Sequence, residues 1–204
     1  MARALTYQNI AAYRPKSLNF TGSWLSSFGC PELAGSWLIW GNSGNGKTRF
    51  ALQLAKYLCG FGHVIYDSLE EGLSLSLQKA IVETNLHDVN RRFLLLDKEP
   101  VAELAERLAR QKSAGVVIID SIQYSGLSYV DYKAVRARFP QKLFILISHA
   151  DGKAPAGRVA RSIRFDANVK VWIEGYRAFP VSRYGGGEPF TIWNEGVVKY
   201  WNEV

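Results

Sequence analysis

Residues 41–48 read GNSGNGKT and match the pattern G-x-x-x-x-G-K-[ST] in full. Glycines let the backbone turn tightly with its N–H groups facing phosphate oxygens, and a following helix offers its positive N-terminus to the same anion. In such a loop Lys47 reaches the β- and γ-phosphates and the Thr48 hydroxyl coordinates Mg²⁺. We therefore expect a nucleoside triphosphate site rather than a glycine-rich turn without a ligand. Its candidate binding residues are Gly41, Asn42, Ser43, Gly44, Asn45, Gly46, Lys47, Thr48 and Arg49.

Short apolar stretches alternate with amphipathic ones on both sides of this loop. The apolar stretches predict strands at 36–40, 63–67, 93–97, 116–120 and 142–148. The stretches between them have helical spacing and predict helices at 49–60, 73–85, 100–115 and 129–139. This alternation is typical of an α/β fold with a mostly parallel central sheet flanked by helices.

The two ends of the chain depart from this alternation. Residues 1–35 are irregular and contain Pro and Gly breakers, so we expect an N-terminal lead-in segment packed on a single domain that spans 36–204. After residue 165, apolar and polar residues alternate between turns. We expect C-terminal antiparallel strands at 169–175, 189–193 and 197–201.

Composition narrows the class of protein. The 204 residues are 48% hydrophobic and 21% charged, which is typical of a globular protein and not of a disordered one. The net charge of +7 favours polyanionic partners, although a merely basic surface explains it equally well. No apolar run approaches the ~18 residues needed to span a bilayer. Cys30 and Cys59 fit no metal-site spacing, so we expect reduced thiols and a cytoplasmic location without membrane contact.

Carboxylates follow two of the predicted strands. Asp120 ends one strand, where it can hold Mg²⁺ through a water, so Thr48 and Asp120 are the candidate metal ligands. Taken alone, an Asp at this point is also typical of a helix cap. Glu70 and Glu71 follow another strand, at the sheet edge where α/β folds bind ligands. Such a glutamate can orient a water and accept its proton, and an acidic pair capping the next helix fits the position equally well.

Five segments together resemble the RecA superfamily, most closely its RadA-like and DnaB-helicase-like branches. The similarity runs from about Gly35 to Trp193. Its segments are GNSGNGKT, YDSLEEG, VVIIDSIQ, FILISHADGKAPAG and YRAFPVSRYGGGEPFTIW. The resemblance implies a RecA-like P-loop NTPase fold that uses ATP and Mg²⁺ and hydrolyses ATP between neighbouring copies in a ring or filament.

The resemblance also implies roles for single residues. Glu70 corresponds to the catalytic base, and Lys47 to the cation on the phosphates. Asp120 and the trailing Gln123 correspond to the second nucleotide-binding motif. His149 corresponds to the sensor of the γ-phosphate, although a histidine satisfied by local hydrogen bonds at a strand end is an alternative.

The C-terminal hairpin of these relatives carries a basic finger that acts on the neighbouring copy. Its motif is usually Lys, one residue, then Arg. Here Val181 occupies the lysine position and Arg183 the arginine position. The resemblance therefore implies that catalysis in trans rests on Arg183 alone, while an ordinary surface arginine is the alternative.

A basic segment follows the sensor strand, and its cations can meet phosphates along a nucleic acid strand. The candidate nucleic-acid contacts are Lys153, Arg158, Arg161 and Arg164. A solvated helix face, or arginines that bridge to acids of a neighbouring copy, explains the same pattern. Tyr124 and Tyr129 can stack on bases or simply pack. The segment from Tyr124 to Tyr132 is short compared with the relatives, which weakens the case for processive movement along DNA.

Two functions follow, and both use a homo-oligomer. The first is ATP hydrolysis coupled to DNA recombination, repair or replication, with single-stranded DNA as a partner. The second is a nucleotide-switched assembly or regulatory ATPase that acts on a protein partner with little turnover. A P-loop kinase is a third reading, but the sequence shows no acceptor-binding lid.

Overall fold

The central strands are buried on both faces, as their uninterrupted apolar sequences predict. Trp37 and Ile39 pack into one core cluster, whereas Leu38 and Trp40 pack into the other. Successive side chains of a strand point to opposite faces, so one strand serves both layers. The computed structural model describes residues 4–202 and confirms the five predicted apolar strands. They are β1 (Gly35–Gly41), β2 (Val64–Ser68), β3 (Phe93–Asp97), β4 (Val116–Asp120) and β5 (Leu143–Asp151).

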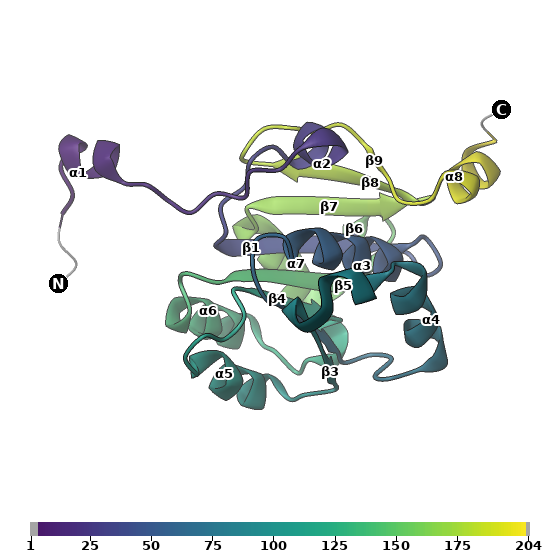
Figure 1. Cartoon of the computed structure of the whole chain (residues 1–204), viewed down its shortest axis with the longest axis horizontal. Helices are drawn as coiled ribbons and strands as arrows, with labels where there is room; N and C mark the ends of the chain where they lie inside the picture. The colour runs from purple at the N-terminus through teal and green to yellow at the C-terminus, as the bar shows by residue number, and fades with distance from the viewer. Residues whose placement is uncertain (1–3, 203–204) are drawn as a thin grey trace.

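These strands form a mostly parallel sheet in the order β3-β2-β4-β5-β1-β7-β8-β9, with β6 paired to the end of β5 (Figure 1). The further strands are β6 (Ala154–Pro155), β7 (Val169–Glu174), β8 (Arg177–Ser182) and β9 (Phe190–Thr191). Strand β7 was expected to be antiparallel, but it runs parallel to β1 on one side and antiparallel to β8 on the other. All carboxyl ends of the parallel strands therefore lie at one edge of the sheet.

Helices cover both faces of the sheet (Figure 1). One face carries α2 (Gly22–Phe28), α3 (Lys47–Leu58), α4 (Leu75–Glu83) and the 3₁₀ segment η1 (Leu86–Arg92). The other face carries α5 (Val101–Ala109), α6 (Tyr129–Arg138) and α7 (Gly157–Asp166). A second 3₁₀ turn, η2 (Ile122–Tyr124), follows β4. Helix α5 ends earlier than the predicted 100–115, because the backbone of Arg110 is already extended.

The predicted strand at 197–201 is wrong, because these residues belong to helix α8 (Asn194–Trp201). In so short a stretch the apolar residues fit a strand and a helix equally well. The helix buries Val197, and the indole Nε1 of Trp201 donates a hydrogen bond to the Gly175 carbonyl at 3.0 Å. The strand predicted at 189–193 is reduced to the two residues of β9.

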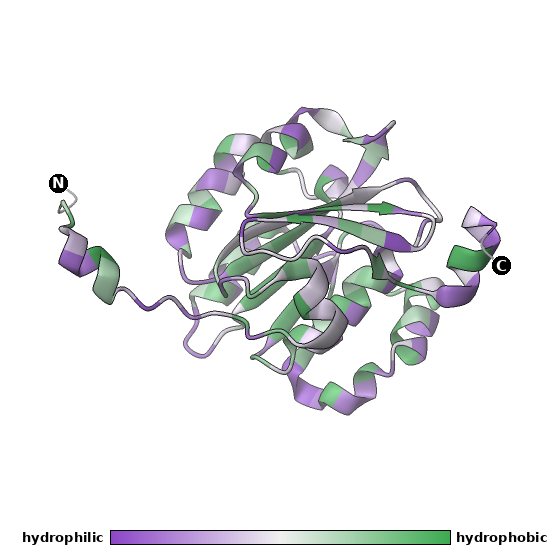
Figure 2. Cartoon of the chain, turned by 90° about the horizontal axis from the view of Figure 1, so that it is seen from above, coloured by the Kyte–Doolittle hydropathy of each residue, from purple (hydrophilic) through white to green (hydrophobic). Residues whose placement is uncertain are grey.

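The described part of the 1–35 segment divides into two. Its second half contributes Leu18, Phe20, Phe28 and Leu33 to the core. Its first half forms α1 (Tyr7–Ala12), which has no buried residue and stands away from the rest of the molecule (Figures 1 and 2). Between residues 4 and 202, no helix has the length and apolar character needed to cross a membrane.

Asp67 of β2 is a charged group placed inside the core. One carboxylate oxygen accepts the Glu99 N–H at 3.1 Å, and the other has no hydrogen-bond partner among the described residues. Burial raises the pKa of Asp67 from 3.8 to about 7, against a smaller lowering by the Glu99 N–H. Between these two values the folded protein binds more protons than the unfolded one. The contribution of Asp67 to the free energy of unfolding therefore decreases as the pH rises through this window.

We expect Asp67→Asn to stabilise the protein relative to the wild type, and the difference to grow from about pH 4 to about pH 8. The upper limit of that growth is ~4 kcal/mol, because the variant carries no buried charge to desolvate. Urea unfolding of both chains at several pH values measures the difference. A difference that stays constant with pH would show that Asp67 does not titrate in the folded protein as described.

Candidate functional site

The phosphate loop connects β1 to α3 and is shaped by glycines at both ends. A Cβ on Gly41 would lie 2.4 Å from the Ile173 carbonyl oxygen, so only glycine fits so close to β7. Gly46 precedes α3 with a φ of +96°, a conformation that strongly favours glycine. Lys47 and Thr48 are therefore the first two residues of α3, at the positive end of the helix dipole.

Lys47 extends back over the loop. Its Nζ donates a hydrogen bond to the Asn42 carbonyl at 3.0 Å. Burial lowers the pKa of Lys47, while the nearby Asp120 and Glu70 carboxylates raise it. The ammonium thus lies between the loop and a pair of acids, which is the electrostatic setting of a cation that meets phosphate oxygens.

Asn45 fastens the loop to the turn between β7 and β8. Its side-chain oxygen accepts the Gly175 N–H at 2.8 Å, and its carbonyl accepts the Tyr176 N–H at 3.2 Å. The Asn45 side-chain amide also donates to the Ser43 carbonyl at 3.2 Å. These contacts hold the loop open against a neighbouring strand pair without using the inward-facing N–H groups of the glycines.

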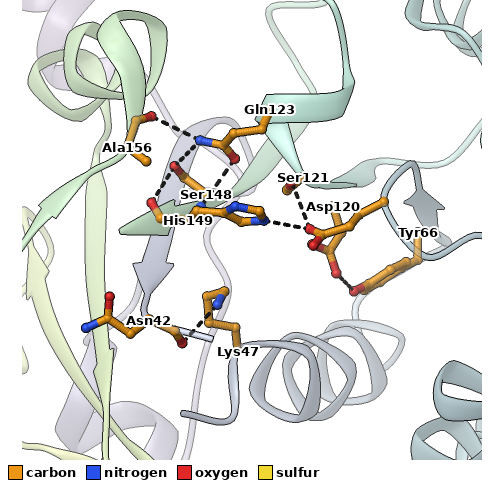
Figure 3. A network of polar contacts seen from close by, with 10 residues as sticks. Asn42, Lys47, Tyr66, Asp120, Ser121, Gln123, Ser148, His149 and Ala156 are labelled. Carbon is orange, nitrogen blue, oxygen red and sulfur yellow. Dashed lines mark hydrogen bonds and ion pairs between the residues drawn. The ribbon is translucent and has the colours of Figure 1, made fainter. Parts of the chain in front are cut away.

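Asp120 lies at the carboxyl end of β4 and is held by Tyr66 of β2. Tyr66 pairs with Ile118, so its side chain shares a face with Asp120, and its hydroxyl donates a hydrogen bond to Oδ2 (Figure 3). Burial raises the pKa of Asp120 to about 6; the Tyr66 hydroxyl lowers it, and Glu70 and Glu71 raise it. A desolvated carboxylate among other acids is a group that a divalent cation stabilises.

Glu70 faces His149 across the same edge. Its Oε2 lies 2.8 Å from the His149 Nε2 and accepts a hydrogen bond from the Ser121 hydroxyl at 3.1 Å (Figure 3). The Glu70 N–H donates to the Asp120 carbonyl at 3.1 Å. The end of β2 is therefore tied to the end of β4, and the Glu70 carboxylate is positioned from two sides.

Gln123 supports His149 from behind. Its side-chain oxygen accepts the His149 backbone N–H at 3.2 Å. Its amide donates to the Ser148 hydroxyl at 2.9 Å and to the Ala156 carbonyl at 3.0 Å (Figure 3). The trailing Gln of the β4 segment thus connects β5 with the segment before α7, so a movement of His149 has a direct connection to that basic helix.

A cavity of about 750 Å³ joins the loop to these acids. It brings together the predicted residues Asn42, Ser43, Gly44, Gly46, Lys47, Thr48, Arg49, Glu70, Asp120 and His149. Among the described residues, no cluster of three or more His, Cys, Asp or Glu side chains forms a metal site by itself. The donors Thr48 and Asp120 therefore fit Mg²⁺ that arrives with phosphate oxygens completing its coordination.

The far wall of the cavity is aromatic, and sequence reasoning missed it. Tyr176 and Trp193 line the cavity and pack edge to face with ring centroids 5.0 Å apart. The Arg49 guanidinium lies 5.0 Å from the centre of the Trp193 ring and forms a 2.6 Å ion pair with Glu83. These aromatic residues come from the C-terminal part of the chain, which no loop motif identifies.

Two groups of predicted residues lie outside this cavity. Arg183 is exposed just after β8, where its N–H donates to the Asn168 carbonyl at 3.2 Å. Asn168 precedes β7, so Arg183 lies at the sheet edge opposite to the phosphate loop of its own chain. In the basic group, Arg161 pairs with Asp151 at 2.6 Å and Arg164 lies 5.1 Å from the Trp40 ring centre. Lys153 and Arg158 are exposed on the same segment.

The parallel order β2-β4-β5-β1, the glycine loop after β1 and the extension β7-β8-β9 define a RecA-like P-loop fold. No protein-family model and no curated protein matches the sequence. Solved structures do match the fold. FlaH, a flagellar accessory protein from Methanocaldococcus jannaschii, has a TM-score of 0.63 and 17% sequence identity, over 87% of this chain and 95% of FlaH.

Two other structures share the architecture. NeqB, an ATP synthase subunit from Nanoarcheaum equitans, has a TM-score of 0.56 and 15% identity, over 78% of this chain and 50% of NeqB. The ATPase domain of a DnaB-like helicase has a TM-score of 0.52 and 15% identity, over 76% of this chain and 80% of that domain. At these identities the likeness shows the RecA-like fold, and function has to be argued from the site.

Proposed function

We propose that this chain binds ATP with Mg²⁺ and hydrolyses it as a RecA-like ATPase. The observation that carries the proposal is the convergence of Lys47, Thr48, Glu70 and Asp120 on one cavity at the carboxyl edge of the sheet. They come from the start of α3 and the ends of two strands, and together they supply the parts that phosphoryl transfer to water requires.

The roles follow from charge and position. Lys47 and the loop N–H groups offset charge on the phosphates. Mg²⁺, held by Thr48 and through water by Asp120, would neutralise the charge that develops between the β- and γ-phosphates. Glu70 orients the attacking water and accepts its proton. His149, which contacts Glu70 at 2.8 Å, senses the γ-phosphate by exchanging that contact for a phosphate oxygen.

The site requires a second copy of the chain. Arg183 is exposed and separated from its own phosphate loop by the length of β8, roughly 20 Å at ~3.4 Å per residue. An arginine at that distance acts on the nucleotide of a neighbour in a head-to-tail ring or filament. We therefore assign Arg183 as a finger in trans.

Coupling to nucleic acid recombination, repair or replication is our first choice, supported by the basic helix α7 and its Gln123 connection to the site. The alternative is a switch that acts on a protein partner. Two observations favour it: Arg161 and Arg164 already have intramolecular partners, and Val181, 66% exposed, replaces the expected lysine. FlaH is described as a flagellar accessory protein, which is also compatible with a protein partner.

ATP turnover with and without single-stranded DNA tests the proposal. We expect Mg²⁺-dependent turnover that Lys47→Ala abolishes, because the variant loses the cation on the phosphates. Stimulation of about tenfold or more by DNA supports the first choice, and a slow rate that DNA leaves unchanged supports the switch. Turnover that persists in Lys47→Ala would show that the activity does not arise at this site.

A further inference from the structure

Helix α1 is a formed helix without a packing partner. It has a complete capping box, in which Thr6 and Asn9 each bond the backbone of the other, and yet none of its residues is buried. Tyr7 is 83% exposed and Ile10 is 61% exposed. Their spacing places both on one face, which Tyr13 extends by a further three residues. An isolated helix of six residues is not stable in water, so this face requires a surface to cover it.

The direction of the helix is fixed at its base. Leu18 donates to the Pro31 carbonyl at 2.7 Å, and Leu33 donates to the Lys16 carbonyl at 2.7 Å. Pro15 restricts the backbone immediately before this pairing. These contacts direct α1 away from its own domain, as both views of the chain show (Figures 1 and 2).

A groove of about 1080 Å³ lies outside the nucleotide site. Its apolar floor comes from α2, α3 and β9 and includes Trp24, Tyr57, Phe61 and Phe190. Its rim includes Glu83 and Asp88, whose side chains are 58% and 52% exposed. An open groove with an aromatic floor and an acidic rim fits an apolar helix that carries positive charge.

We propose that α1 of one copy docks into this groove on the next copy of the chain. The apolar face of the helix matches the aromatic floor, and the complementarity extends to charge. Residues 1–31 contain no Asp or Glu, and Arg14 and Lys16 follow the helix. The arm and the groove are different surfaces of one chain, so the contact is head-to-tail and repeats along a ring or filament. This inference goes beyond ATP hydrolysis and does not depend on it.

Complementary variants test the contact in the absence of nucleotide, at about 10–100 µM protein, where a contact of this size is populated. Ile10→Asp disables the arm and leaves the groove intact. Asp88→Arg disables the groove, because it places a cation against the basic arm, and leaves the arm intact. We expect light scattering to show wild-type oligomers that grow with concentration, at least ~10-fold weaker assembly of each variant alone, and dimers in a mixture of the two.

Matched controls separate docking from misfolding. Gln8→Asp adds the same charge to the same helix away from its apolar face and should leave assembly unchanged. Phe61→Asp is a second groove variant, and the melting temperatures of all variants are compared with that of the wild type. A monomeric wild type, Ile10→Asp oligomers like those of the wild type, or a mixture without dimers would each overturn the proposal, including the case in which α1 binds another protein.

Discussion

Replacing Glu70 by glutamine should reduce ATP turnover about 10³-fold while nucleotide binding remains. Glutamine keeps the size of the side chain and its contacts to His149 and Ser121, which in the wild type are 2.8 Å and 3.1 Å long. It cannot accept the proton of the attacking water. Single-turnover hydrolysis and binding of a fluorescent ATP analogue measure the two effects separately.

Glu71→Gln is the matched control for this change. The Glu71 carboxylate accepts the hydroxyls of Ser74 and Ser76 at 3.1 Å and 2.7 Å, so it is turned toward the start of α4. We expect this variant to retain most of its turnover. Loss of turnover in Glu71→Gln with normal turnover in Glu70→Gln would reverse the assignment of the base.

Arg183→Ala should lower turnover about 10³-fold, because the guanidinium that stabilises charge on the neighbour's phosphates is lost. The variant still has an intact loop and Glu70, whereas Glu70→Gln still has an intact Arg183. In a mixture, about a quarter of the interfaces join an intact base to an intact finger. We therefore expect mixing two inactive chains to restore about a quarter of the wild-type turnover, measured as phosphate release.

A chain with both changes is the control for this mixture. Mixed with either single variant, it offers no interface that contains both Glu70 and Arg183, so no activity should return. Turnover that Arg183→Ala alone leaves unchanged, or an active single variant that is insensitive to mixing, would contradict catalysis in trans.

The fold was accessible from the sequence because its strands are uninterrupted apolar runs and its loop has a strict pattern. Residues 36–40 and 41–48 suffice to place a strand, a glycine turn and a helix in order. The end at 197–201 was not accessible, because Val197 and Trp201 fit a strand and a helix alike until the contact of Trp201 with Gly175 is known. Period alone does not distinguish the two in five residues.

The site was accessible in part, for a similar reason. Lys47 and Asp120 are marked by motifs or by strand ends, and the structure brings them to one cavity. Tyr66 was not identified, because a tyrosine inside an apolar strand reads as core until the register with β4 is known. Tyr176 and Trp193 come from segments far along the chain, so only the tertiary structure brings them to the loop.

The most direct test of the central claim is a crystal structure or cryo-EM map of Glu70→Gln with ATP and Mg²⁺. The account predicts the triphosphate inside the turn formed by residues 41–48, with the Lys47 ammonium on the β- and γ-phosphates and the metal beside Thr48. An empty turn, or nucleotide bound elsewhere on the chain under the same conditions, would contradict it.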